Sequence, residues 1–228
     1  MTTDASVDKY DLEYDDARLE GTSKVVQFYN SYAEQYERIL DEQVFFWIGE
    51  YSAGVLWKTL TEKMKTDEEK AQLAVIDVAC GTGKTGEFLK EAGFTIMDGV
   101  DPAEKMLEIA RQKKIFREIH VGRMGPDPTV DGFKTIADNT YDGLLCVGCL
   151  TKGSAAVKDA IPEFHRILKK GGYGVYVISQ SLNKIDALKD HIPYFEEQKL
   201  DIVMIEKKFY RIYNEVTTYC HVYVVQKM

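Results

Sequence analysis

The segment VIDVACGTGKTG at residues 75–86 holds the residues best suited to binding a ligand. The backbone has no side chains at Gly81, Gly83 and Gly86, where an apolar run meets a predicted helix. A ligand can therefore lie against the backbone amides and near the N-terminus of the helix dipole. Asp77 precedes the first of these glycines by four residues, and Asp101 follows it by 20. The spacing predicts a site in which backbone amides and two carboxylates hold one small ligand.

Three ligand classes compete for this segment. GTGKT at 81–85 matches the end of a phosphate-binding loop, but that loop needs glycine where this chain has Val78. A dinucleotide fits better, because Asp101 stands where a ribose-binding carboxylate belongs. Asp77 would repel a pyrophosphate yet attract an ammonium group. The charges therefore favour S-adenosylmethionine, which has an ammonium, a carboxylate and a ribose, while a nicotinamide-type oxidoreductase remains the alternative.

Four segments resemble the successive motifs of a class I S-adenosylmethionine-dependent methyltransferase, over about residues 73–180. They are VIDVACGTGKTGEFLKEAGF, GVDPAEKMLEIAR, YDGLLCVGCL and IPEFHRILKKGGYGVYVIS. FYNSYAEQYERIL at 28–40 is similar to the start of the methyltransferase-like proteins named for the Williams-Beuren syndrome region. The resemblance implies an enzyme that moves a methyl group from S-adenosylmethionine in line to an acceptor, leaving S-adenosylhomocysteine.

The resemblance also implies which residues bind the cofactor: Tyr29, Tyr36, Asp77, Ala79, Cys80, Gly81, Thr82, Gly83, Asp101, Pro102, Met106, Arg123, Met124 and Val147. Asp77 would meet the methionine ammonium and Asp101 the ribose hydroxyls, and the tyrosines would close over the donor. Ala79 replaces a usual glycine, which a right-handed backbone tolerates. HVGRMGPDP lacks the usual acid for adenine, so Arg123 or Met124 would support that ring. Structural alternatives stay open: a strand-end carboxylate for Asp77, a helix cap for Asp101 and a packing role for the tyrosines.

The acceptor pocket is predicted from aromatic and loop residues, which differ most among such enzymes. The substrate residues are Tyr32, Trp47, Cys149, Thr151 and Lys152, with Phe45, Phe46, Tyr51, Trp57, Gln180, Ser181 and Asn183 beside them. An aromatic-rich pocket suits a small, partly apolar molecule. No residue is assigned as general base and no metal site is expected. His165 and Glu163 are interpreted as scaffold, and His120, His191 and His221 have no partner visible in the sequence that would favour them as a general base. A methyltransferase fold that binds without turnover is a further alternative.

The chain has four cysteines, too few for a disulfide scaffold at this length, so a reducing compartment and a cytoplasmic location are expected. Cys146 and Cys149 form a CxxC pair within the apolar run GLLCVGCL. No second pair stands at zinc-ribbon spacing. The pattern favours buried or pocket-lining thiols over metal or redox work.

The elements that must position these residues alternate along the chain. Apolar runs at 73–78, 94–101, 117–122, 141–148 and 173–179 predict strands, and 83–93, 102–114 and 156–172 predict helices. This order predicts a doubly wound, mostly parallel sheet, which the resemblance extends to the seven-stranded, Rossmann-like methyltransferase fold. Segments 201–214 and 215–227 predict an antiparallel terminal hairpin, and 23–64 a helical cap containing a lid.

Composition and charge set the remaining limits. The 228 residues predict one domain at 23–228, with the α/β core at 73–228. Residues 1–22 carry seven acidic side chains and predict a mobile acidic leader. With 29 basic and 37 acidic residues the net charge is −8, which disfavours nucleic acid and anionic lipid as partners. A small-molecule acceptor is the expected partner, and the oligomeric state is not predicted.

Overall fold

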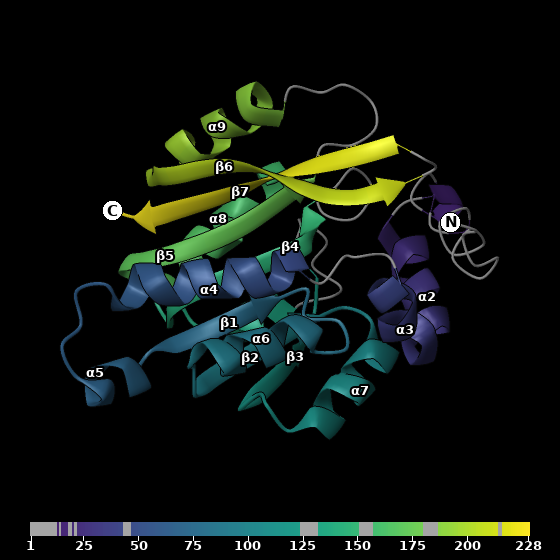
Figure 1. The fold of residues 1–228 in the computed structure, drawn as a ribbon, viewed down its shortest axis with the longest axis horizontal. Helices are drawn as coiled ribbons and strands as arrows, with labels where there is room; N and C mark the ends of the chain where they lie inside the picture. Colours follow the sequence, from purple (N-terminus) through teal and green to yellow (C-terminus); the bar gives the residue numbers. More distant parts are fainter. Residues whose placement is uncertain are drawn as a thin grey trace.

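The computed structural model describes residues 13, 15–17, 20, 22–42, 47–123, 132–150, 157–179, 187–213 and 216–228. Within these residues, seven strands form one sheet that runs through the molecule (Figure 1). The strands are β1 Ala74–Val78, β2 Ile96–Asp101, β3 Glu118–Val121, β4 Tyr141–Leu150, β5 Leu168–Ser179, β6 Leu200–Tyr213 and β7 Val216–Lys227.

The strand order is β3-β2-β1-β4-β5-β7-β6, with β1 to β5 parallel and β7 antiparallel to both of its neighbours. The prediction of a doubly wound, seven-stranded sheet that ends in an antiparallel hairpin is confirmed. The order reverses between β1 and β4, and ligands of such sheets bind beside the carboxyl ends of the strands at that point. The glycine-rich segment follows β1, so the topology places it there.

The helices cover both faces of the sheet. Their bounds are α2 Thr22–Tyr32, η1 Ala33–Gln35, α3 Tyr36–Glu42, α4 Trp47–Thr61, α5 Asp67–Ala71, α6 Lys84–Ala92, α7 Glu104–Lys113, η2 Gly132–Thr135, α8 Val157–Ile167 and α9 Ala187–Glu197. One core joins α4 and α6 to the sheet, and a second joins α8 and α9 to the opposite face. Alternate residues of the central strands enter each core, since successive side chains of a strand point to opposite faces.

Two elements differ from the sequence prediction. The helix predicted to end at the glycine pair stops at Ile167, and β5 begins at Leu168. Leu168 pairs with Tyr141, and a Cβ on Gly172 would stand 2.9 Å from the Asp142 carbonyl oxygen, so Gly172 serves a close approach of two strands rather than a helix end. Helix α9 was not predicted.

Helices α2, η1 and α3 pack beside α7 at one end of the sheet and are called the lid here (Figure 1). Most of the predicted leader lies outside the described residues. No helix in the described part of the chain is long and apolar enough to cross a membrane. The division into leader, cap and core stays a prediction.

Candidate cofactor site

The chain makes a tight turn between the end of β1 and the start of α6. Gly81 and Gly83 have positive φ angles of 53° and 84°, which glycine adopts without a side-chain clash. Ala79 has a φ of 61°, so the prediction of a right-handed backbone at this position was wrong. The cause is local: the N–H groups of Ala79 and Cys80 both donate to the Val100 carbonyl oxygen, at 2.8 and 3.1 Å, which bends the chain across β2.

Asp101 ends β2 and faces this turn. Its Oδ2 accepts a hydrogen bond from the Gly81 N–H at 3.0 Å, and its Oδ1 accepts one from the Ala103 N–H at 2.8 Å. The side chain is buried, and burial raises the pKa of Asp101 to about 6 although both hydrogen bonds lower it. The two amides fix the orientation of the carboxylate, and each oxygen keeps a lone pair for a ligand.

Asp77 lies in β1 and is also buried, with 1% of its surface exposed. Burial first, and then the charge of Asp101, raise the pKa of Asp77 well above its ordinary value, while the Gly86 N–H opposes the shift. Its Oδ2 has no hydrogen-bond partner in the described structure. A buried carboxylate with an unsatisfied oxygen beside a second carboxylate attracts a cationic ligand.

A third buried carboxylate, Asp98 of β2, is different because its oxygens are satisfied. Arg117 donates to both of them, at 3.0 and 2.5 Å, and the Tyr141 hydroxyl and the Glu118 N–H add bonds of 2.8 and 3.1 Å. Asp98 therefore has a structural role. Both oxygens of this buried aspartate are hydrogen-bonded within the protein, in contrast to those of Asp77, of which Oδ2 has no partner in the described structure.

The lid reaches the cofactor turn through two tyrosines. Tyr29 and Tyr36 meet edge to face at 5.8 Å between ring centroids, and both pack on the cluster of Ala103 and Met106. A Cβ on Gly81 would stand 4.0 Å from the ring of Tyr36. The structure thus brings the predicted residues Tyr29, Tyr36, Gly81 and Met106 together.

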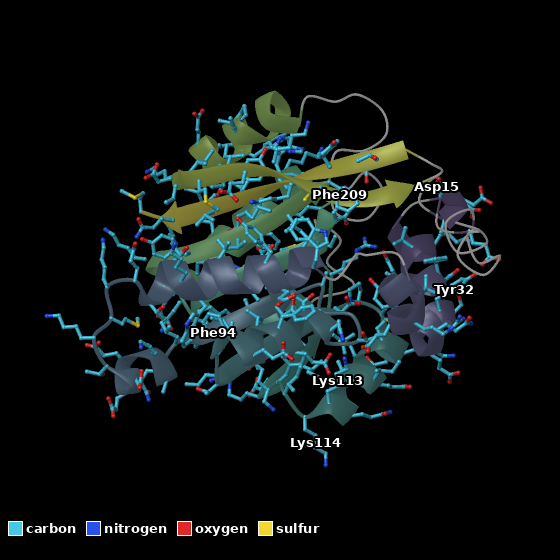
Figure 2. All side chains as sticks on the ribbon, viewed as in Figure 1. Asp15, Tyr32, Phe94, Lys113, Lys114 and Phe209 are labelled. Carbon is cyan, nitrogen blue, oxygen red and sulfur yellow. The ribbon has the colours of Figure 1, made fainter. Side chains whose placement is uncertain are left out.

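Polar contacts that the sequence analysis did not predict also hold the lid. Lys113 lies near the end of α7 (Figure 2). It pairs with Glu37 of the lid at 2.6 Å and with Glu87 of α6 at 3.0 Å. The Asn30 side chain accepts a hydrogen bond from the Lys105 N–H in the first turn of α7 at 3.0 Å. The two contacts that join the lid to α7 link residues 75 and 76 positions apart in sequence, so periodicity carried no signal for them.

Tyr32, predicted to line the acceptor pocket, packs inside the lid with Phe28 and Ile39 (Figure 2). Its hydroxyl donates to Glu13 at 2.6 Å. Burial, followed by this carboxylate, raises the pKa of Tyr32 to about 12. Glu13 belongs to the predicted leader, so at least one leader residue contacts the lid.

The ring centroids of Trp47 and Tyr51, at the start of α4, lie 6.1 Å apart. Both rings pack on the core that includes Val147. The Tyr51 hydroxyl donates to Glu206 of β6, and Lys208 approaches the same carboxylate at 2.9 Å. The indole Nε1 of Trp47 is buried without a partner in the described structure.

The remaining predicted residues divide into three groups. Cys80, Thr82 and Gly83 are buried in the turn after β1, and Pro102 is partly buried next to Asp101. Cys149 lies beside Cys146, and Arg123 follows the end of β3. Outside the described residues lie Phe45, Phe46, Met124, Thr151, Lys152, Gln180, Ser181 and Asn183.

The profile of a family described as a methyltransferase domain matches residues 75–172. Human methyltransferase-like protein 27 is 35% identical over 98 residues, which cover 43% of this chain and 37% of that protein. A ubiquinone/menaquinone biosynthesis C-methyltransferase from Campylobacter jejuni is 24% identical over 68% of this chain and 63% of its own length. This chain therefore spans less than two thirds of either relative.

A putative methyltransferase from Geobacillus sp. strain WCH70 is 30% identical over 182 residues, covering 77% of this chain and 67% of that protein. The crystal structure of a TehB-like, S-adenosylmethionine-dependent methyltransferase from Corynebacterium glutamicum shares the fold, with a TM-score of 0.57, 19% identity, and coverage of 88% of this chain and 98% of that one. Together with the turn and the carboxylates after β1 and β2, these similarities show that the chain belongs to the class I S-adenosylmethionine-dependent methyltransferases.

Proposed function

We propose that this chain transfers the methyl group of S-adenosylmethionine, by in-line displacement, to a small and partly apolar acceptor. The observation that carries the proposal is the pair of buried carboxylates on adjacent strand ends. Asp77 has an oxygen without a partner among the described residues, and Asp101 is held by the amides of Gly81 and Ala103. S-adenosylmethionine offers an ammonium group and ribose hydroxyls that complement these two carboxylates.

In this proposal each part of the turn has one task. Asp77 pairs with the methionine ammonium, since that cation relieves both the unsatisfied oxygen and the repulsion from Asp101. Asp101 accepts from the ribose hydroxyls through lone pairs that the amides of Gly81 and Ala103 leave free. The Gly81–Gly83 backbone lies beside the methionine carboxylate and the sugar, where a side chain would block the approach.

The lid covers the bound donor and excludes water. Tyr29 and Tyr36 stand over the turn on Ala103 and Met106, and the contacts of Asn30 and Glu37 hold them there. When bound, S-adenosylmethionine supplies a methyl group that its sulfonium charge already activates. The residues of this chain then need to orient the acceptor and desolvate the reacting atoms, and a general base is required only where the acceptor must lose a proton.

The proposed acceptor class follows from the side chains near the start of α4. Trp47 and Tyr51 present aromatic surface, and the Trp47 Nε1–H, which has no partner among the described residues, would donate to one polar atom of the acceptor. The relative from Campylobacter jejuni is named for ubiquinone/menaquinone biosynthesis. Such an acceptor would also combine an apolar body with a few polar atoms.

The test uses S-adenosylmethionine labelled in its methyl group and a cell extract separated into small molecules, protein and nucleic acid. We expect S-adenosylhomocysteine and a labelled product only with the small-molecule fraction, and much less of both with the Asp77→Asn variant when the donor concentration is near the Kd of the unaltered chain. A labelled protein or nucleic acid would refute the acceptor class. Tight binding of S-adenosylmethionine without product from any fraction would instead favour the non-catalytic alternative, and tighter binding of NADH would refute the cofactor.

A further inference from the structure

The thiols of Cys146 and Cys149 lie close together at the end of β4, although the proposed transfer reaction does not use them. Their Sγ atoms are 2.8 Å apart. Residues three apart on a regular strand are separated by about 10 Å and point to opposite faces. This strand is irregular: its register with β5 shifts between Cys146 and Leu150, and Gly148 has a φ of 82°. The bulge brings the two thiols onto one side.

The surroundings of the two sulfurs differ in a way that suits sequential oxidation. Cys146 is fully buried, whereas Cys149 is only partly buried and can meet a small oxidant. Burial first, then the Cys149 thiol and the Asp77 carboxylate, raise the pKa of Cys146. Cys146 therefore stays a thiol until a neighbouring electrophile forms. Among the described residues, no third His, Cys, Asp or Glu completes a metal site with this pair.

We propose that Cys146 and Cys149 are a peroxide-sensitive modification site, whose intramolecular disulfide weakens the binding of S-adenosylmethionine. A disulfide needs a sulfur separation of about 2.05 Å, so the sulfurs must approach by roughly 0.75 Å. The bulge at Gly148 can absorb this movement, because glycine tolerates a wide range of backbone angles.

The chemistry balances with hydrogen peroxide as oxidant. The Cys149 sulfur attacks one peroxide oxygen and the O–O bond breaks. The departing hydroxide takes the Cys149 proton and becomes water, and Cys149 is left as a sulfenic acid. The Cys146 sulfur then attacks the Cys149 sulfur, the S–O bond breaks, and the departing hydroxide takes the Cys146 proton as a second water. The two thiols lose two electrons in total, and one peroxide becomes two waters.

The link to the cofactor is the pairing of β4 with β1. Cys146 stands opposite Val78, and Leu145 stands opposite Asp77. Val78 is followed directly by the glycine turn. Disulfide formation would draw Cys149 towards Cys146 and change the shape of the bulge between them. Because β4 pairs with β1, this change would move the end of β1 that carries Asp77. A displaced Asp77 loses its contact with the ammonium group of the donor.

The chemical test uses the reduced full chain, hydrogen peroxide, an iodoacetamide quench, and mass analysis of the tryptic peptide of residues 135–152, which contains both cysteines. We expect this peptide to lose the mass of two hydrogen atoms, to resist alkylation, and to recover both thiols with dithiothreitol. Cys220→Ala, which changes a buried cysteine elsewhere in the sheet, should behave in the same way. Cys149→Ser should form no internal crosslink.

The functional test compares S-adenosylmethionine affinity before and after peroxide, within each variant. We expect the Kd to rise about tenfold on oxidation of the unaltered chain and of Cys220→Ala, to return with dithiothreitol, and to change little in Cys149→Ser. The proposal is overturned if Cys146 remains alkylatable while Cys149 becomes a sulfinic acid, if the crosslink joins two chains, or if the Kd does not respond to the disulfide. Neither readout requires methyl transfer, so failure of the proposed function would be recognised separately.

Discussion

The Asp77→Asn substitution separates a ligand-binding carboxylate from a structural one. Asparagine keeps the shape of the side chain but carries no charge, and in the free protein that charge is buried beside Asp101. The free energy of unfolding without ligand should therefore be unchanged or higher at neutral pH. The affinity for S-adenosylmethionine should fall by about 1.5 to 3 kcal/mol, the range for a hydrogen bond to a charged group, or roughly 10- to 150-fold in Kd.

Asp98→Asn is the matched control, since Asp98 is equally buried but fully partnered. Removing its charge leaves Arg117 and Tyr141 with a weaker acceptor, and because Arg117 is half exposed the cost should be about 1 to 3 kcal/mol. The melting temperature should fall by several degrees at about 2 to 4 °C per kcal/mol, with cofactor affinity retained. Thermal melts and titration calorimetry measure both quantities. If Asp77→Asn instead melts lower and binds the cofactor normally, then Asp77 is a strand-end carboxylate and the reasoning is refuted.

Three further predictions concern pH, the lid and the turn. The pKa of Asp101 is about 6 in the folded chain against an ordinary 3.8, so the folded chain binds more protons than the unfolded chain between these pH values. The free energy of unfolding, compared with that of Asp101→Asn, should therefore fall by up to about 3 kcal/mol as the pH rises from about 4 to 6. A difference that does not change with pH in denaturant melts would contradict this. Glu37→Gln, which removes the ion pair with Lys113, should weaken cofactor binding about two- to fivefold and reduce its salt dependence, as calorimetry at two ionic strengths would show. Ala79→Gly should stabilise the fold by about 0.5 to 1 kcal/mol by relieving a left-handed φ. Gly86→Ala should cost about 1 to 3 kcal/mol, since its Cβ would overlap the ring of Phe116 and stand 2.9 Å from Ile115; equal melting temperatures would contradict both.

The parallel core could be predicted because its strands are buried on both faces and therefore form continuous apolar runs. AVIDV became β1 and IMDGVD became β2, close to the predicted bounds. The predicted end of α8 was wrong, because a glycine pair after a helical pattern is typical both of a helix end and of a close strand approach. Only the pairing of Leu168 with Tyr141 distinguishes the two cases, and that pairing is not local.

The candidate site also has residues that could be predicted from the sequence and contacts that could not. Asp77 and Asp101 could be predicted, because a fixed spacing from the glycines defines both. Sequence periodicity could not predict the contact of Tyr51 with Glu206, whose residues are 155 positions apart. That contact exists because the terminal hairpin extends the sheet beyond β5 and brings β6 alongside the start of α4. The proposed cofactor side depends mainly on the turn after β1 and the end of the neighbouring β2, whereas the proposed acceptor side is assembled from segments far apart in sequence.

Three departures from ordinary folding rules meet at the turn after β1. Ala79 has a left-handed backbone, Asp77 has an unsatisfied buried oxygen, and the pKa of Asp101 is raised by burial, and all three residues lie within or beside the same turn. Each feature costs about 1 to 3 kcal/mol, which is a large share of a typical stability of about 5 to 15 kcal/mol. Asp98 shows that the same sheet satisfies a buried aspartate when only folding is at stake. A cationic ligand with hydroxyl groups removes the cost at Asp77 and uses the orientation of Asp101, so the strain of the free protein points to the cofactor that the turn binds.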